Sequence, residues 1–215
     1  MGEYLLEPLA YGFMQRGLLA SVLVAVVCGA LGSFVVLKGL AFIGDALAHA
    51  SFGGVALAFV LGLNVYAGAF VFALATALGI GALSQHGKVR SDTAIGVLFA
   101  GTFALGIAVI SGVESYTTDL FGYLFGDVLS ITARDLAAIS LAGAAVLALL
   151  GLFYRQLLFV AFDPAVAAAS GVPARALEYL LLALLGMTIV AALQAVGIVL
   201  VVALLVTPSA TAHLF

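Results

Sequence analysis

Long apolar runs separated by short polar breaks constrain this chain more than any other feature of its sequence. A helix of about 20 apolar residues crosses the hydrocarbon core of a bilayer, and a backbone inside that core has to satisfy its own hydrogen bonds, as a helix does. The long runs occupy residues 17–37, 42–62, 65–85, 93–112, 136–154, 176–194 and 196–214. The sequence therefore predicts an all-α, polytopic transmembrane bundle of seven spans that forms a single domain over residues 1–215.

The composition agrees with a membrane protein and excludes other classes. Hydrophobic residues make up 66% of the chain and charged residues 8%, with a mean hydropathy of +1.34, whereas soluble domains are about 45–50% apolar and about 25% charged. The net charge of -3 and the scattered Lys and Arg residues give no basic surface for nucleic acid. Cys28 is the one cysteine in the sequence, so the chain forms no intrachain disulfide and no thiolate metal cluster.

The basic residues in the short loops predict the orientation, because cytoplasmic loops of membrane proteins are enriched in Lys and Arg. The opening MGEYLLEP carries two glutamates instead of the basic start of a signal peptide, so we interpret the N-terminus as mature. With the N-terminus outside, five basic residues lie in the cytoplasm and two lie outside: Lys38, Lys88, Arg90, Arg155 and Arg175 against Arg16 and Arg134.

Two segments between the spans carry structure of their own. The stretch DLFGYLFGDVLSIT, residues 119–132, is apolar but too short to cross the membrane, which predicts a surface helix or a re-entrant segment. In the cytoplasmic break between the fifth and sixth spans, Asp163 and Pro164 form a typical helix start, and Gly171 followed by a proline forms a typical stop. The sequence thus predicts a helix of about two turns at 163–171, which is either a docking element for a soluble partner or an ordinary connector.

Asp45 and His49 form an ionisable pair inside the second apolar run. They are four positions apart, so on a helix both side chains project from one face. An ionised aspartate near the centre of a membrane helix costs about 2.5–3.5 kcal/mol on insertion scales, so such residues commonly mark an ion or substrate path. A carboxylate and an imidazole suit divalent manganese, iron or zinc. The alternative is a structural role, in which Asp45, near the predicted cytoplasmic end of its span, caps the helix and His49 bonds to it.

Other sequence features predict close helix packing and an energy source that lies on another chain. Small residues at four-residue spacing predict close helix packing, and Gly53, Gly54 and Pro208 are candidates for a gate or hinge as well as for packing and a kink. The sequence contains no P-loop, nucleophile elbow or HExxH motif. We therefore expect that the chain is not an enzyme and that another chain hydrolyses any ATP that drives it.

Three motifs resemble one family. GDALAHASFGGVALAFVLG resembles the second span of the membrane permeases of ATP-binding-cassette importers for divalent metals, the zinc and manganese uptake family. FDPAVAAASGVPARALEYLLLALLGMTIVAALQAVGIVLVVALLVTPSATA is similar to that family's cytoplasmic coupling segment and the two spans after it, and YLFGDVLSIT resembles its midchain motif. The resemblance runs from about residue 15 to the end of the chain.

The resemblance implies an architecture and a set of partners. The expected fold is that of a type II importer permease, related to the importers for cobalamin and siderophores, in the cell membrane of a prokaryote. Two copies form a homodimer, surrounded by lipid, that works with two cytoplasmic ATPase subunits and an extracytoplasmic metal-binding protein. No cofactor is expected to bind stably; zinc, manganese or iron passes through as substrate.

The resemblance also assigns residues. It implies that Asp45 and His49 lie on the translocation path, and that the helix at 163–171 is the coupling helix in the ATPase cleft. Four residues of that helix are the expected coupling positions: Asp163, Pro164, Ala167 and Gly171.

The chain departs from the family in two ways. The family commonly has a proline where this chain has Gly53, so the local kink is expected to differ. Members usually continue for another span or two beyond TPSATA, so we expect a chain that stops at Phe215 to be a fragment or a reduced form.

Two other functions compete with metal import. A siderophore or cobalamin permease has the same architecture but needs a wide path and has no use for a paired Asp and His. A non-transporting membrane scaffold or an ion channel is the second alternative, and a capped cytoplasmic helix argues against the channel because that helix would have no partner.

Overall fold

The computed structural model describes residues 10–85, 90–112 and 126–214. The long apolar runs of the sequence form long helices, and short breaks with polar residues or glycine separate most of them. The helices are α2 (Gly12–Leu37), α3 (Ile43–Val60), α4 (Val65–Gln85), α5 (Ser91–Ser111), α7 (Ala133–Leu152), α8 (Tyr154–Phe162), α9 (Pro164–Ala169) and α10 (Ala174–Ala212). Within these ranges the structure contains no strand.

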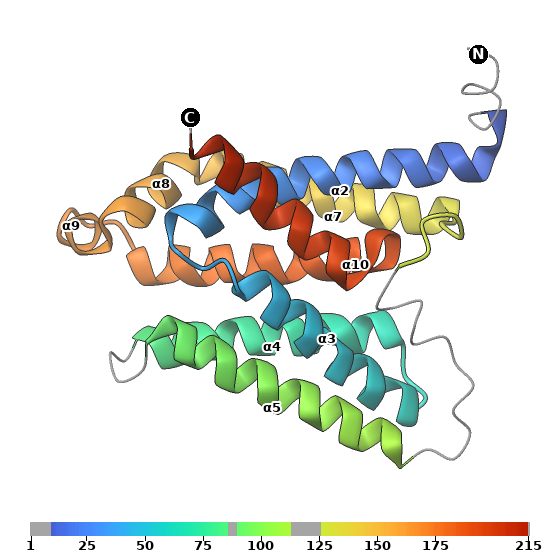
Figure 1. Cartoon of the computed structure of the whole chain (residues 1–215). Coiled ribbons are helices and arrows are strands. Elements are labelled where there is room, and N and C mark those ends of the chain that lie inside the picture. The colour runs from blue at the N-terminus through green and yellow to red at the C-terminus, as the bar shows by residue number, and fades with distance from the viewer. Residues whose placement is uncertain (1–9, 86–89, 113–125, 215) are drawn as a thin grey trace.

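Seven helical segments of the described chain are long and apolar enough to cross a membrane. Five of them are the helices α2, α3, α4, α5 and α7, and α10 contains the other two, Ala174–Leu193 and Ala195–Ala212. Gly197 has φ 72° and ψ 172°, which interrupts the helical backbone within α10. The second half of α10 then folds back along the bundle in Figure 1. The prediction of seven spans and an all-α membrane bundle is confirmed, including the boundary near residue 195.

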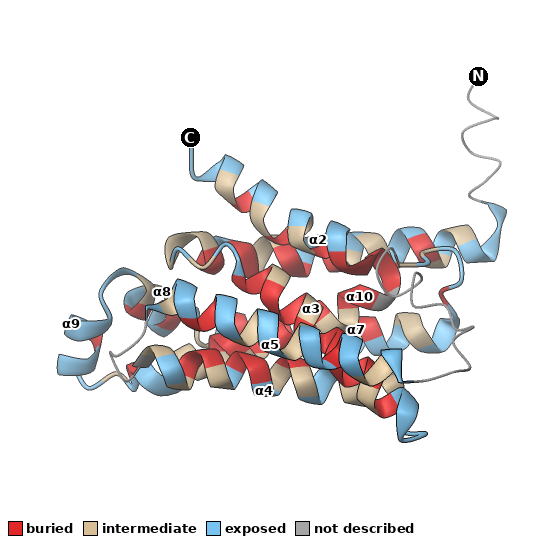
Figure 2. Ribbon diagram, turned by 60° about the horizontal axis from the view of Figure 1, so that its bottom comes forward, coloured by how far each residue is buried: buried red, intermediate tan, exposed pale blue. Residues whose placement is uncertain are grey.

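The helices form two groups that meet along α3 and where α4 packs against α10. Helices α2, α7 and α10 pack together on one side, and α4 and α5 lie on the other (Figure 1). Helix α3 contacts α4, α5 and α10, and 72% of its span is buried, compared with 17% for α5. Figure 2 shows the buried residues on the inward faces of the helices and exposed residues on the outward faces. Helix α3 is therefore the central element of the described bundle.

Glycines bring α3 into close contact with both of its neighbours on one side. A Cβ atom added at Gly54 would meet the backbone carbonyl of Gly68 in α4. A Cβ atom added at Gly106 in α5 would lie 2.8 Å from the Cα atom of Gly53. Small residues at such crossings let helix backbones approach closely. Packing accounts for Gly53 and Gly54, and a gate or hinge role for them stays a prediction.

Pro208 lies within the second half of α10, and the helix continues through it to Ala212. The residue with non-helical backbone angles inside α10 is Gly197, eleven positions earlier. Next to Pro208, the Ser209 hydroxyl donates a hydrogen bond of 3.2 Å to the Gly29 carbonyl of α2. A gate at Pro208 stays a prediction.

The segment predicted as a surface helix or a re-entrant segment at 119–132 is described only from residue 126. Residues 126–132 form turns and extended backbone rather than a helix. The buried side chain of Ile131 and a 2.9 Å hydrogen bond from Arg16 Nε to the Ile131 carbonyl attach this stretch to α2. Thr132 and Asp135 then form a capping box that starts α7. The surface helix is wrong for 126–132, where turns and the cap of α7 take its place, and the re-entrant alternative stays a prediction. Residues 119–125 lie outside the described residues.

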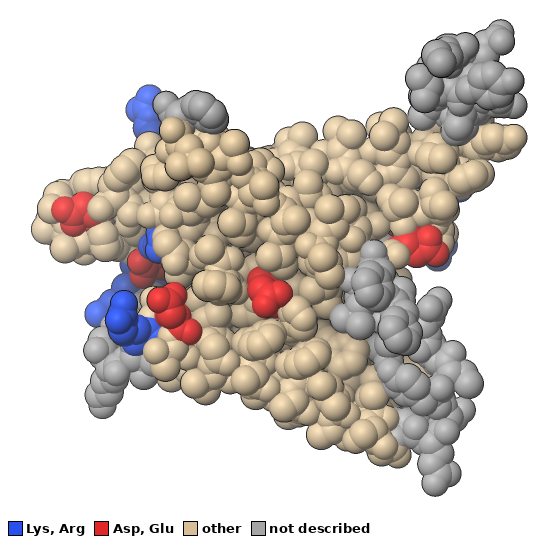
Figure 3. Space-filling model, in the orientation of Figure 1, with Lys and Arg blue, Asp and Glu red and all other residues tan. Residues whose placement is uncertain are grey.

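The described basic residues gather at one end of the bundle. Lys38 ends α2, Arg90 precedes α5, Arg155 lies in the first turn of α8, and Arg175 lies in the first turn of α10. These positions belong to the end that carries α8 and α9, where Figure 3 shows most of the Lys and Arg surface of the visible face. Arg16 and Arg134 start α2 and α7 at the other end, and Lys88 lies outside the described residues. This asymmetry agrees with the predicted orientation, with α8 and α9 in the cytoplasm.

Candidate functional site

The linker between α2 and α3 turns into the bundle before α3 begins. Gly39 has φ +65°, and its N–H and that of Leu40 donate to the carbonyls of Val36 and Val35, which closes the end of α2 as a Schellman motif. Ile43, the first residue of α3, is fully buried. In Figure 1, α3 starts nearer the middle of the bundle than the ends of α4, α5 and α10 on the same side. The first turn of α3 therefore lies nearer the middle of the bundle than the neighbouring helix ends do.

Asp45 and His49 face the same side of α3, as their spacing predicted. His49 Nδ1 lies 2.9 Å from the backbone carbonyl of Asp45 and 3.2 Å from its Oδ1. Because a carbonyl oxygen only accepts, this hydrogen bond requires the proton on Nδ1. In the neutral imidazole, Nε2 then carries no proton. A metal ion binds to an unprotonated ring nitrogen of this kind. Asp45 thus orients the imidazole and fixes its tautomer.

Asp45 does not cap α3. The N-cap is Phe42, which makes no side-chain cap bond, and Asp45 lies three positions further on, in the first turn. A carboxylate there interacts favourably with the partial positive charge at the helix N-terminus. Of the structural role considered for Asp45, the structure therefore shows the pairing with His49 but not the helix cap.

Two aromatic rings from α5 hold the imidazole of His49. The rings of Phe99 and Phe103 each lie 5.2 Å from it, edge to face at 82° and 84°. The two phenylalanines are four positions apart on α5 and nearly parallel to each other, with 4° between their planes. Edge-to-face packing is a favoured arrangement of aromatic rings, so α5 helps to hold the imidazole of His49 in place. The sequence analysis missed both residues; their four-residue spacing in LFAGTF was the available signal.

Asp45 opens onto a pocket between α3 and α5. The lining includes Phe42, Ala46, Gly96 and Phe99, together with a second acidic residue, Asp92, in the first turn of α5. The side chain of Asp45 is 43% exposed and that of His49 is 23% exposed. Figure 3 shows an acidic patch surrounded by surface without Lys, Arg, Asp or Glu near the middle of the visible face. An accessible carboxylate in an apolar span is the chemical feature that distinguishes this face.

One copy of the chain supplies too few ligands for a tight metal site. Among the described residues, no three His, Cys, Asp or Glu side chains come together. One carboxylate and one imidazole nitrogen can bind a divalent ion weakly. A transport path needs this property, because the ion has to leave again.

The short helix predicted at 163–171 is present as α9, and its own sequence closes both ends. Asp163 Oδ1 accepts hydrogen bonds from the N–H groups of Ala165 and Val166 at 3.1 and 2.9 Å, and Pro164 occupies the first turn. Gly171 has φ +84°, and its N–H donates to the Ala168 carbonyl. Three of the four predicted coupling positions, namely Asp163, Pro164 and Gly171, therefore build the helix itself.

The fourth predicted coupling position, Ala167, is fully buried within the chain. Where α8 meets α9, the exposed apolar side chains are Phe162, which is 71% exposed, and Val166, which is 50% exposed. These two residues, which the sequence analysis missed, give the end of the bundle with α8 and α9 an apolar surface outside the spans. A substitution that tests docking belongs at Phe162 or Val166, because a large side chain at Ala167 disturbs the fold first.

Comparison with known proteins agrees with this geometry. The model of the ABC 3 transport family matches residues 10–215. The manganese transport system membrane protein MntC of Halalkalibacterium halodurans is 47% identical over 208 residues, which cover 97% of this chain and 71% of that protein. The manganese import system permease protein ScaB of Streptococcus parasanguinis is 41% identical over 205 residues, covering 95% of this chain and 73% of that protein.

A solved structure gives the same result in three dimensions. PsaBC from Streptococcus pneumoniae, in complex with Fab, superposes with a TM-score of 0.85 and 42% sequence identity, covering 100% of this chain and 78% of that chain. The resemblance that three motifs of the sequence carry is thereby confirmed over nearly the whole chain. This chain belongs to the ABC 3 transport family and is a permease subunit for the import of divalent metal ions.

Proposed function

We propose that this permease imports manganese across the cell membrane of a prokaryote as a homodimer. A separate cytoplasmic ATPase hydrolyses ATP, so the permease itself catalyses no reaction, and an extracytoplasmic metal-binding protein delivers the ion. Zinc and iron are the competing substrates. The names of the two manganese permeases quoted above support the choice of manganese.

The observation that carries the proposal is the accessible carboxylate of Asp45 beside His49 inside an apolar bundle. A charge that faces lipid at this depth is unfavourable, so such a residue normally faces a water-filled path or another protein surface. A second copy that covers the face formed by α3 and α5 removes Asp45 from lipid. It also brings a second carboxylate and a second imidazole to the same path.

The donor set fits a path for manganese. Two carboxylates and two imidazole nitrogens are hard to borderline ligands, which bind Mn²⁺, Fe²⁺ and Zn²⁺ but suit Cu⁺ poorly. His49 presents Nε2 in an orientation that Asp45, Phe99 and Phe103 fix, so little rearrangement accompanies binding. Since zinc binds most N and O sites more tightly than manganese, selection against zinc has to come from geometry or from the delivering protein.

The cytoplasmic helix α9 is proposed as the coupling helix. Its exposed apolar side chain Val166, with Phe162 at the end of α8, provides the contact surface for the ATPase. Its caps at Asp163 and Gly171 make a short helix rigid without help from the partner. A rigid helix can transmit a movement of the ATPase to the adjoining span.

The test is manganese uptake by proteoliposomes that contain the permease, its ATPase and its binding protein. Asp45→Asn and His49→Ala are expected to reduce uptake to background while the ATPase still co-purifies with the permease. Asp127→Asn is the matched control, because Asp127 is exposed outside the spans and its bond to the Ser130 amide uses an oxygen that asparagine keeps. Uptake at the wild-type rate in Asp45→Asn and His49→Ala would show that the path lies elsewhere.

A further inference from the structure

Lys38 and Glu178 form an ion pair between two segments that are 140 residues apart in the chain. Lys38 Nζ lies 2.7 Å from Glu178 Oε1, and the two side chains are 16% and 27% exposed. Lys38 is the residue at which α2 ends, and Glu178 lies in the second turn of α10. Both groups are on the cytoplasmic end of the bundle, and their partial burial makes the loss of either partner unfavourable for the other.

Glu178 is closely connected to the coupling helix. Only residues 170–173 separate α9 from α10. Hydrogen bonds hold this connection in one conformation. The Val172 N–H donates to the Ala167 carbonyl at 3.0 Å, and the Ala174 N–H donates to the Val172 carbonyl at 2.8 Å. A displacement of α9 therefore moves the first turns of α10, and Glu178 with them.

Lys38 is equally closely connected to Asp45. It begins the linker to α3, and that linker is pinned by hydrogen bonds from Leu40 N–H to the Val35 carbonyl and from Ile43 N–H to the Leu40 carbonyl, both 2.9 Å. Asp45 follows two residues after Ile43. If Lys38 moves along the membrane normal, the first turn of α3 consequently moves with it.

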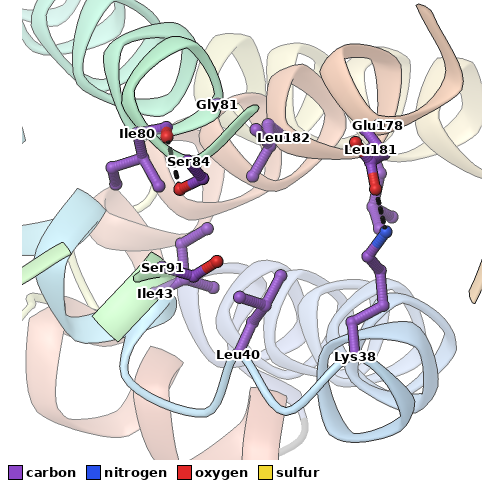
Figure 4. Close-up of a pocket in the computed structure, with 10 residues that line it drawn as sticks. All are labelled: Lys38, Leu40, Ile43, Ile80, Gly81, Ser84, Ser91, Glu178, Leu181 and Leu182. Carbon is purple, nitrogen blue, oxygen red and sulfur yellow. Dashed lines mark hydrogen bonds and ion pairs between the residues drawn. The ribbon is translucent and has the colours of Figure 1, made fainter. Parts of the chain in front are cut away.

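The linker and α10 enclose a pocket beside the ion pair. In Figure 4, Leu40 of the linker, Ile80 and Ser84 of α4, and Leu182 of α10 surround the open space, and Lys38 reaches across one side to Glu178. Close packing normally limits relative movement of neighbouring segments. Here the open space leaves room for the linker to shift relative to α10 while the ion pair keeps the two segments attached.

The tight backbone contact between α2 and α10 lies on the other half of α10. A Cβ atom at Gly32 of α2 would meet the Leu205 carbonyl, and Leu205 lies beyond the break at Gly197. This contact holds α2 against the second half of α10, whereas the Lys38–Glu178 pair joins the end of α2 to the first half. A merely structural role of the pair predicts lower stability of the protein with an unchanged ratio of manganese imported to ATP hydrolysed.

We propose that the Lys38–Glu178 ion pair transmits movement of the coupling helix α9 to the α2–α3 linker and so repositions Asp45 on the metal path. Lys38 and Glu178 are positioning residues, since neither lies at the pocket of Asp45. The proposal rests on the proposed function, in which α9 binds the ATPase and Asp45 binds the ion. Coupling between distant sites requires such a contiguous element that both sites can bias.

The experiment measures manganese imported per ATP hydrolysed by the complete transporter in proteoliposomes. Lys38→Met and the nearly isosteric Glu178→Gln are each expected to lower this ratio by about five- to tenfold, the lower part of the usual range for allosteric coupling. ATP hydrolysis and co-purification of the ATPase persist in both variants. The charge exchange Lys38→Glu with Glu178→Lys is expected to restore the ratio to within about twofold of wild type, because it recreates the attraction.

Arg134→Gln is the control, because Arg134 is an exposed cation in the first turn of α7, at the other end of the bundle; its ratio stays at the wild-type value. A wild-type ratio in Lys38→Met and Glu178→Gln overturns the proposal, and so does a charge exchange that fails to restore the ratio. If Asp45→Asn transports at the wild-type rate, the proposed path itself is wrong. A wild-type ratio in Lys38→Met together with an inactive Asp45→Asn rejects the ion-pair proposal alone.

Discussion

Helices α3 and α9 each carry an aspartate at or near their N-terminus, but different interactions hold the two side chains. Asp163 caps α9 through two backbone N–H groups that lie two and three residues further along the chain. Asp45 caps nothing; it pairs with His49 and opens onto a pocket that α5 completes. The comparison shows that Asp163 needs only an acceptor oxygen, whereas the proposed role of Asp45 needs a negative charge.

The same substitution at the two aspartates should separate these roles most clearly. Asp45→Asn is expected to reduce manganese uptake by about 100-fold or more, because a neutral amide loses the charge attraction to a divalent ion. Asp163→Asn is expected to retain nearly full uptake, since asparagine is as good an N-cap as aspartate. Uptake by both variants is compared in the same proteoliposome assay. Equal uptake by the two variants would contradict the distinction.

The next largest effect is expected from a substitution at the glycine contact between α3 and α4. Gly54→Ala is expected to destabilise the protein by about 1–3 kcal/mol, because the added methyl group meets the Gly68 carbonyl of α4. Gly151→Ala in α7 is the control: nothing lies within 4 Å of the added atom, so helix propensity alone stabilises the variant by up to about 1 kcal/mol. Thermal unfolding of the detergent-solubilised protein measures both changes. A Tm for Gly54→Ala at or above that of wild type would show that α3 and α4 can separate at this crossing.

Removal of the cap of α9 should have a smaller and local effect. Asp163→Ala is expected to cost about 0.5–2 kcal/mol, because two N–H groups lose their acceptor. Amide hydrogen exchange should become faster in α9 and remain unchanged in α3, and stimulation of the ATPase by the permease should fall. If exchange in α9 stays at the wild-type rate, contacts with α8 and α10 rather than the cap hold the helix.

The smallest effect is expected at the aromatic residues beside His49. Phe99→Leu or Phe103→Leu removes one edge-to-face contact, worth about 0.5–1.5 kcal/mol, which should raise the manganese concentration for half-maximal uptake by about two- to tenfold. Phe70→Leu in α4 is the control, because Phe70 is exposed on the surface of the bundle. The measurement is uptake as a function of manganese concentration. A change of the same size in Phe70→Leu would attribute the effect to general packing.

Much of the fold and part of the candidate site could be predicted from the sequence. The ends of the observed spans lie within a few residues of the predicted ones, because apolar length and polar breaks are local properties. Asp45 and His49 were found from their spacing alone. Phe99, Phe103 and Asp92 were not, because they come from α5 and no local pattern relates them to α3. The Lys38–Glu178 pair was missed for the same reason, since it joins residues 140 positions apart.

The sequence by itself determined the number of described spans, the two ends of α9 and the shared face of Asp45 and His49. Each of these depends on residues within one or two helical turns of one another, where hydrogen bonds and spacing are local. Only the tertiary structure decided that α3 begins inside the bundle, that Phe99 and Phe103 hold His49, and that Ala167 is buried while Val166 is exposed. These features depend on which helices pack together, and the described spans carry apolar residues on nearly all sides, so their sequences do not reveal which helices are neighbours.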